Sequence, residues 1–192
     1  MSHTRCLAGC GILKKEILYL NKKNGWQLET CFACSSLHVN FDKLSDALNR
    51  MLDRAPEDTI VLYGECHPLM DRIVASHHAH RVPAQNCIEM LLGKDVFTSE
   101  LQKGAFFLLE DWARRWDFVT KDVFGRSPDD MIDILRSAHD HFLCLRTPCS
   151  GDFREDALTL SKRFKIPLEW RDVSLDILDT MLCNLLSGVE TV

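Results

Sequence analysis

The sequence predicts an α/β fold in three layers, with a largely parallel sheet and helices on both of its faces. Short apolar segments alternate with segments of helical period along the whole chain, as in successive βαβ units. Residues 59–63 form the clearest strand, because they are rich in β-branched residues and uninterrupted, as in strands buried on both faces. The 192 residues suit a single domain, and the one candidate seam between two lobes lies near residues 125–128.

The other elements follow from the same two periods. Further strands are expected at residues 5–7, 28–34, 105–109, 142–145 and 168–173. Helices are expected at residues 41–54, 87–92, 112–124, 128–138, 154–165 and 177–186. Ser127 and Pro128, followed by two aspartates, form a helix start signal. Trp112 and Trp116 recur at helical spacing and are expected in the core.

Charge and motif content exclude several classes of function. The net charge of −5 argues against a nucleic-acid partner, since such proteins are usually basic. The sequence contains no P-loop, no dinucleotide-binding glycine motif and no nucleophile elbow. No segment approaches the roughly 20 apolar residues of a membrane span. Residues 7–10 resemble a lipoprotein cleavage box but lack a preceding apolar region, so a cytoplasmic location is expected.

Cysteines follow several of the predicted strands. The chain contains nine cysteines, an odd number, which argues against a disulfide framework and favours metal or redox chemistry. Cys10, Cys34, Cys66 and Cys149 each lie at or just beyond the carboxyl end of a predicted strand. In open α/β sheets, ligands bind at those ends. The alternative for each thiol is a small buried hydrophobic side chain.

The sharpest hypothesis is a metal site built by Cys10, Cys66 and Cys87, with His67 or Cys34 as a further ligand. Soft thiolates select zinc, iron–sulfur clusters or Cu(I). Three protein ligands with an open fourth position are typical of catalytic zinc, and such a position suits a small thiol, a methyl donor or a partner protein. The competing hypotheses are a non-catalytic α/β scaffold with buried structural cysteines, and thiol–disulfide or persulfide chemistry. The sequence leaves the metal, the reaction and the oligomeric state open.

Two other clusters allow metal chemistry but are weaker. Cys31 and Cys34 have the spacing of a chelating or redox pair, but the chain offers no second pair to complete a zinc ribbon. Residues 77–80 contain three histidines, and if residues 71–80 are helical, His77 and His80 share a face. The alternative for the histidine run is a polar helix end, where imidazoles suit the helix dipole.

Short motifs over residues 5–186 resemble the DUF1638 family, whose members occur largely in anaerobic bacteria and archaea. They are CGIL at 10–13 with Glu16, LH at 37–38, YGEC at 63–66, NCIEMLLG at 86–93, and GAFF at 104–107 leading to Trp112. The resemblance implies no reaction, because the family's function is unknown. This chain departs from the family pattern, with His67 and Pro68 where Cys-Gly is usual and Gln85 and Asn86 where His-Asp is usual.

Overall fold

The protein is described here by a computed structural model that covers residues 5–124 and 128–188. The chain forms two compact units. Unit 1 contains Met1–Leu91 and Leu175–Val192, and unit 2 contains Leu92–Ser174. Each unit has its own all-parallel sheet, which confirms the predicted α/β class but divides the strands between two sheets. Of the predicted seam near 125–128, residues 125–127 lie outside the described part of the chain.

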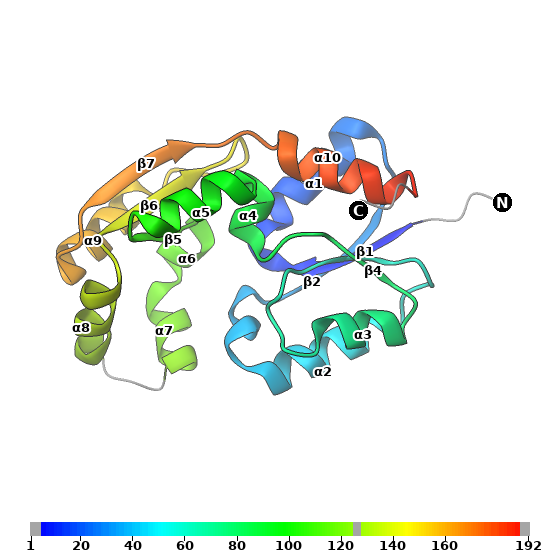
Figure 1. Ribbon diagram of the computed structural model, residues 1–192, viewed down its shortest axis with the longest axis horizontal. Coiled ribbons are helices and arrows are strands. Elements are labelled where there is room, and N and C mark those ends of the chain that lie inside the picture. Colours follow the sequence, from blue (N-terminus) through cyan, green and yellow to red (C-terminus); the bar gives the residue numbers. More distant parts are fainter. Residues whose placement is uncertain (1–4, 125–127, 189–192) are drawn as a thin grey trace. The chain divides into compact units, whose positions relative to one another are not determined.

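Unit 1 is built on a four-stranded sheet in the order β2-β1-β3-β4. Its strands are β1 (Cys6–Cys10), β2 (Glu29–Ala33), β3 (Ile60–Leu62) and β4 (His80–Arg81). Its longer helices are α1 (Lys14–Asn24), α2 (Phe41–Leu52), α3 (Met70–Ser76) and α10 (Asp176–Leu186). Helices α1 and α10 cover one face of this sheet and α2 and α3 the other (Figure 1). The order reverses at β1, because the chain moves outward to β2 and then returns across β1 to β3.

The core of unit 1 follows from its apolar pattern. On α2, Leu44, Leu48 and Leu52 recur every four residues and are buried against Ala8 of β1. Helix α2 begins where the Asn40 side chain accepts a hydrogen bond from the Lys43 N–H, at 3.0 Å. Helix α2 is therefore held in place against this face of the sheet, and the strands that lead to the cysteines are packed beneath it.

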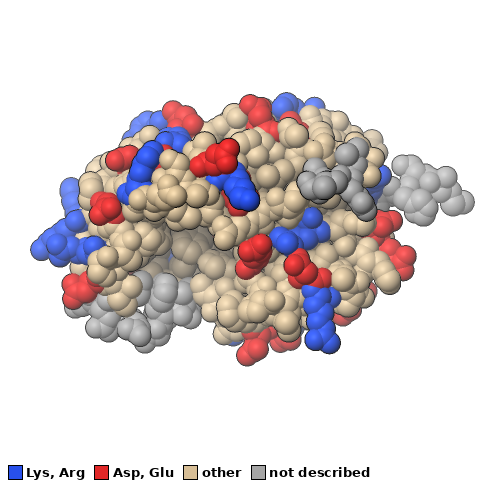
Figure 2. All heavy atoms as spheres, viewed as in Figure 1, with Lys and Arg blue, Asp and Glu red and all other residues tan. Residues whose placement is uncertain are grey.

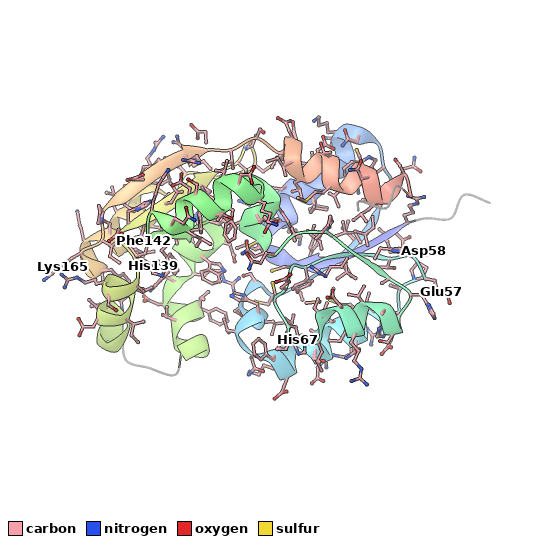
Figure 3. All side chains as sticks on the ribbon, in the orientation of Figure 1. Glu57, Asp58, His67, His139, Phe142 and Lys165 are labelled. Atoms are coloured by element: carbon pink, nitrogen blue, oxygen red, sulfur yellow. The ribbon has the colours of Figure 1, made fainter. Side chains whose placement is uncertain are left out.

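Unit 2 is built on a three-stranded sheet in the order β5-β6-β7. Its strands are β5 (Ala105–Leu108), β6 (His141–Arg146) and β7 (Leu168–Asp172). Its helices are α5 (Lys94–Gln102), α6 (Glu110–Arg114), α7 (Trp116–Phe124), α8 (Pro128–Ala138) and α9 (Arg154–Phe164). Trp116, Phe142 and Phe164 meet edge to face, with centroids 5.2–6.3 Å apart, and form an aromatic core (Figure 3 labels Phe142). Trp116 is thus a core residue, as predicted.

Basic and acidic side chains are interspersed over the face of the molecule shown in Figure 2. Among the helices of the described residues, none has the length and apolar character that crossing a lipid bilayer requires.

Candidate metal centre

Each strand of the unit 1 sheet is followed by a cysteine. Cys10 is the last residue of β1, Cys34 follows β2, Cys66 lies four residues beyond β3, and Cys87 opens α4 (Cys87–Leu92) after β4. Because the strands are parallel, their carboxyl ends share one edge of the sheet. Cys10 and Cys66 follow the adjacent strands β1 and β3, where the strand order reverses. Such a switch point is where open α/β sheets bind ligands.

A close backbone approach joins the segments that carry Cys66 and Cys87. A Cβ atom on Gly64 would lie 2.1 Å from the Gln85 carbonyl oxygen, so only glycine fits there. The Glu65 N–H donates to the same oxygen, at 2.7 Å. The segment after β3 therefore lies directly against the segment before α4, and Cys66 and Cys87 approach each other from separate parts of the chain.

Cys87 is held at the first turn of α4 by a capped helix start. The Asn86 side-chain oxygen accepts the N–H groups of Ile88 and Glu89, each at 3.0 Å. The buried Glu89 carboxylate accepts the Gln85 N–H at 3.2 Å, in an arrangement close to a capping box. Asparagine is among the residues that cap helices best, so Asn86 suits this position and fixes the backbone around Cys87.

The three thiols lie within electrostatic reach of one another. Burial raises the pKa of the Cys87 thiol, and the neighbouring Cys10 and Cys66 raise it further. Burial also raises the pKa of Cys66, partly offset by the Gly64 backbone and by Arg81. All three cysteines are half-buried, and none of them forms a disulfide within the described part of the chain. Among the described residues, no three His, Cys, Asp or Glu side chains already stand as a metal-binding group. Cys87 therefore has Cys10 and Cys66 as neighbours, and the three thiols are not arranged around a common point.

Tyr63 adds a group that the sequence analysis did not select. The side chain is only 2% exposed, and its hydroxyl has no hydrogen-bond partner among the described residues. It belongs to a buried cluster against which Cys10 and Cys66 pack. Burial and these thiols raise the pKa of the phenol well above its ordinary value, so it remains a neutral donor. An unsatisfied buried hydroxyl costs about 1–3 kcal/mol. Its position just before Gly64 is the signal that could have identified it.

His67 is committed to the turn that leads into α3 (Figure 3). Its Nδ1 accepts the Leu69 N–H at 2.9 Å, and its carbonyl oxygen accepts the Met70 N–H at 3.0 Å. The buried ring packs edge-on against Phe41, with centroids 5.5 Å apart. Because Nδ1 is the acceptor, a neutral ring carries its proton on Nε2. In this conformation His67 has no free nitrogen lone pair for a metal.

Cys34 lies at the same carboxyl edge of the sheet, but it follows the outer strand β2, at the opposite end of the strand order from β4. It is exposed, and its Sγ lies 3.2 Å from the Ser36 hydroxyl. Strands β1 and β3 separate β2 from β4, so Cys34 and Cys87 follow strands about 14 Å apart. Its CxxC partner Cys31 is exposed on β2, beside Ala8 in the strand register. Cys10, Cys66 and Cys87 are therefore neighbours. Cys31 and Cys34 belong to β2 and its end, which lie nearer in the sheet to β3, the strand before Tyr63, than to β4, the strand before Cys87.

The histidine run does not form the helical face that residues 71–80 were expected to provide. Helix α3 ends at Ser76, and His78 has a left-handed φ of 51°. His77 Nε2 contacts Asp53 at 3.1 Å, whereas His80 belongs to β4 and contacts Asp58 at 3.1 Å. The condition for a shared face, a helix over residues 71–80, is not met, because the left-handed His78 leads the chain into a strand; His77 instead stands at the helix end, as the alternative had it.

Comparisons with known proteins agree with this description only at the level of the family. No match was found among curated proteins or among solved structures. Residues 32–182 match the family described as "Protein of unknown function (DUF1638)", and this range includes Cys34, Tyr63, Cys66 and Cys87. Because the match spans most of the chain, the protein belongs to the DUF1638 family.

Proposed function

We propose that the protein binds one soft metal ion, zinc in the first instance, through Cys10, Cys66 and Cys87. The observation that carries the proposal is geometric: Cys10 and Cys66 follow adjacent strands at the switch point of a parallel sheet, and the contact of Gly64 and Glu65 with the Gln85 carbonyl brings the segment of Cys66 against that of Cys87. A divalent cation would bind them as thiolates and remove the repulsion between them. The proposal requires side-chain rotations that bring the three sulfurs around one ion.

The unpartnered Tyr63 hydroxyl supports a ligand at this place. A buried donor without a protein partner is rare, and it is usually satisfied by water, an ion or a bound molecule. A hydrogen bond from this hydroxyl to a metal-bound thiolate, or to a molecule on the metal, would recover the cost of burying it.

Three cysteine ligands leave a fourth position, and we propose a small thiol as its occupant. Zinc held by Cys10, Cys66 and Cys87 would lower the pKa of such a thiol, which would lose its proton to solvent and become a nucleophile. With a methyl donor, the sulfur would form a bond to the methyl carbon, and the donor would leave with the electron pair of its broken bond to that carbon. The protein would then act in thiol or one-carbon transfer, alone or as an accessory to a partner protein, in the reducing cytoplasm.

A second candidate is a non-catalytic scaffold with structural thiols. It is favoured by the lack of a ready-made metal-binding group among the described residues and by the raised pKa values of Cys66 and Cys87. The two candidates differ in one measurable quantity, which is the metal content of the protein.

Anaerobic purification followed by elemental analysis and a visible spectrum tests the proposal. We expect one equivalent of zinc in the wild type, none in Cys66→Ser, and one in Cys183→Ser. Cys183 is the matched control because it is a free, half-buried thiol on α10, hydrogen-bonded to Asp179. A brown protein with iron and sulfide would replace zinc by a cluster on the same ligands. Metal-free wild type that binds no zinc on addition would leave only the scaffold.

A further inference from the structure

A groove of about 530 Å³ lies on the sheet of unit 1, away from the proposed metal ligands. Helix α2 lies over β1 and β2 at this point, and β2 is an edge strand. The volume falls within the range of small-molecule binding sites. The groove is lined by Cys6, Glu29, Thr30, Cys31, Ala33, Leu37, Ala47, Arg50, Met51, Arg54 and Ala55.

Several of the side chains that line the groove are small. Cys31 and Ala33 lie on β2, Ala47 lies on α2 and Ala55 lies just beyond it, whereas Leu44, Leu48 and Leu52 of α2 are buried in the core. Sheet and helix therefore leave a space between them that none of the lining side chains fills. Most of the lining surface is apolar, which suits the hydrocarbon part of a ligand.

Two arginines form the charged end of the groove. Arg50 lies in the last turn of α2 and Arg54 in the turn that follows the helix, and both are exposed. Arg50 Nε donates to the Asp46 carbonyl oxygen at 3.1 Å, which leaves its terminal nitrogens available. Within the described part of the chain, neither guanidinium forms an ion pair with a carboxylate. Glu29 also lines the groove, and its carboxylate accepts the Cys6 thiol at 3.7 Å.

We propose that this groove binds a small amphipathic anion, with a carboxylate or phosphate head on Arg50 and Arg54 and an apolar body along Ala33, Ala47 and Met51. Two guanidiniums against one carboxylate leave a net positive charge at this end, and arginine recognises both head groups through paired hydrogen bonds. The inference does not depend on the metal site, because none of the groove residues is a proposed metal ligand.

The test is calorimetric titration of the full chain with octanoate, octyl phosphate, octanol and octylammonium. We expect both anions to bind at least about tenfold more tightly than octanol, and octylammonium to bind most weakly, from the usual strength of charge-assisted hydrogen bonds. A preference between octanoate and octyl phosphate identifies the head group. Equal binding of octanol and the anions would overturn the role of the arginines.

Variants locate the ligand. Arg50→Gln with Arg54→Gln should weaken the anions about tenfold and leave octanol unchanged, whereas Glu29→Gln should strengthen the anions. Arg72→Gln, an exposed arginine on α3, is the matched control and should have no effect. Ala47→Trp should block all four compounds, with the folded state checked by circular dichroism. Undiminished anion binding by the double arginine variant would contradict the proposal even if Ala47→Trp failed to fold.

Discussion

The two parallel sheets end in different chemistry at their carboxyl edges. In unit 1 the edge carries half-buried thiols and the unpartnered hydroxyl of Tyr63. In unit 2 the charged groups at this edge are paired within the protein: Arg146 forms an ion pair with Asp172 at 2.7 Å, although its buried Nε makes no hydrogen bond among the described residues, and the buried Glu110 carboxylate accepts the Gly151 N–H at 2.8 Å.

This comparison indicates that a cysteine beyond the end of a parallel strand is not sufficient evidence of a metal site. Cys149 follows β6 as Cys10 ends β1, but its segment is closed by hydrogen bonds between Thr147 and Ser150. There the Thr147 N–H donates to the Ser150 hydroxyl at 3.0 Å. What distinguishes unit 1 is the combination of several coupled thiols with a donor that the protein leaves unsatisfied.

The largest expected effect is a loss of stability on truncating a core residue of unit 2. Phe142→Ala removes the central ring of the aromatic cluster and should lower the free energy of unfolding by about 3–5 kcal/mol. Urea denaturation followed by tryptophan fluorescence measures the loss. A decrease below about 1 kcal/mol would show that this cluster does not hold unit 2 together.

Gly64→Ala should disrupt the carboxyl edge of the unit 1 sheet, where the proposed metal ligands lie. The added Cβ meets the Gln85 carbonyl oxygen, so the backbone must separate, and we expect about 2 kcal/mol of lost stability and at least about tenfold weaker metal binding. Gly25→Ala is the control, because Gly25 has a left-handed φ of 64° with no atom within 4 Å of the added Cβ, so it strains the chain away from the site. Equal metal affinity in both variants would contradict the role given to Gly64.

The buried thiol of unit 2 should make stability depend on pH. Burial raises the pKa of Cys144 from 9.0 to about 12. Between these values the unfolded chain loses the proton and the folded chain keeps it, so this contribution is complete below pH 9 and declines above it. Relative to Cys144→Ala, the wild type should lose about 2 kcal/mol between pH 8 and pH 10.5. Parallel stability curves for the two proteins would show that Cys144 ionises normally when folded.

The smallest expected changes in stability should have opposite signs at the carboxyl edges of the unit 1 and unit 2 sheets. Tyr63→Phe removes an unsatisfied hydroxyl and should stabilise the metal-free protein by about 1 kcal/mol. Ser150→Ala removes the acceptor of the Thr147 N–H and should destabilise it by about 1 kcal/mol. Thermal unfolding of both variants gives the comparison. Destabilisation by Tyr63→Phe would mean that the hydroxyl has a partner in solution.

Much of the fold could be predicted from periodicity, but two helices were missed. Helices α2 and α9 and strands β3 and β6 have long apolar patterns and lie close to their predicted positions. Helices α1 and α5 were not predicted, because exposed apolar residues interrupt their buried stripe: Leu18 and Tyr19 in α1, and Val96 and Leu101 in α5. The division into two sheets depends on long-range pairing, which a pattern of local periods does not contain.

The candidate site was predicted in part. Cys10, Cys66 and Cys87 could be selected from the positions of the strands and the neighbouring glycines. His67 could not be assigned, since its place in the turn depends on the Leu69 N–H. The unsatisfied state of Tyr63 could not be predicted at all, because it depends on every polar group around the side chain.

Titration of the metal-free protein with cobalt(II) tests the central claim most directly, because sulfur-to-cobalt charge-transfer absorption grows with the number of thiolate ligands. We expect one cobalt per chain with the absorption of three thiolates in the wild type and in Cys183→Ser. We expect weaker binding with the absorption of two thiolates in Cys10→Ser, Cys66→Ser and Cys87→Ser. Three-thiolate absorption that persists in any of those three variants, or a wild type that binds no cobalt, would contradict it.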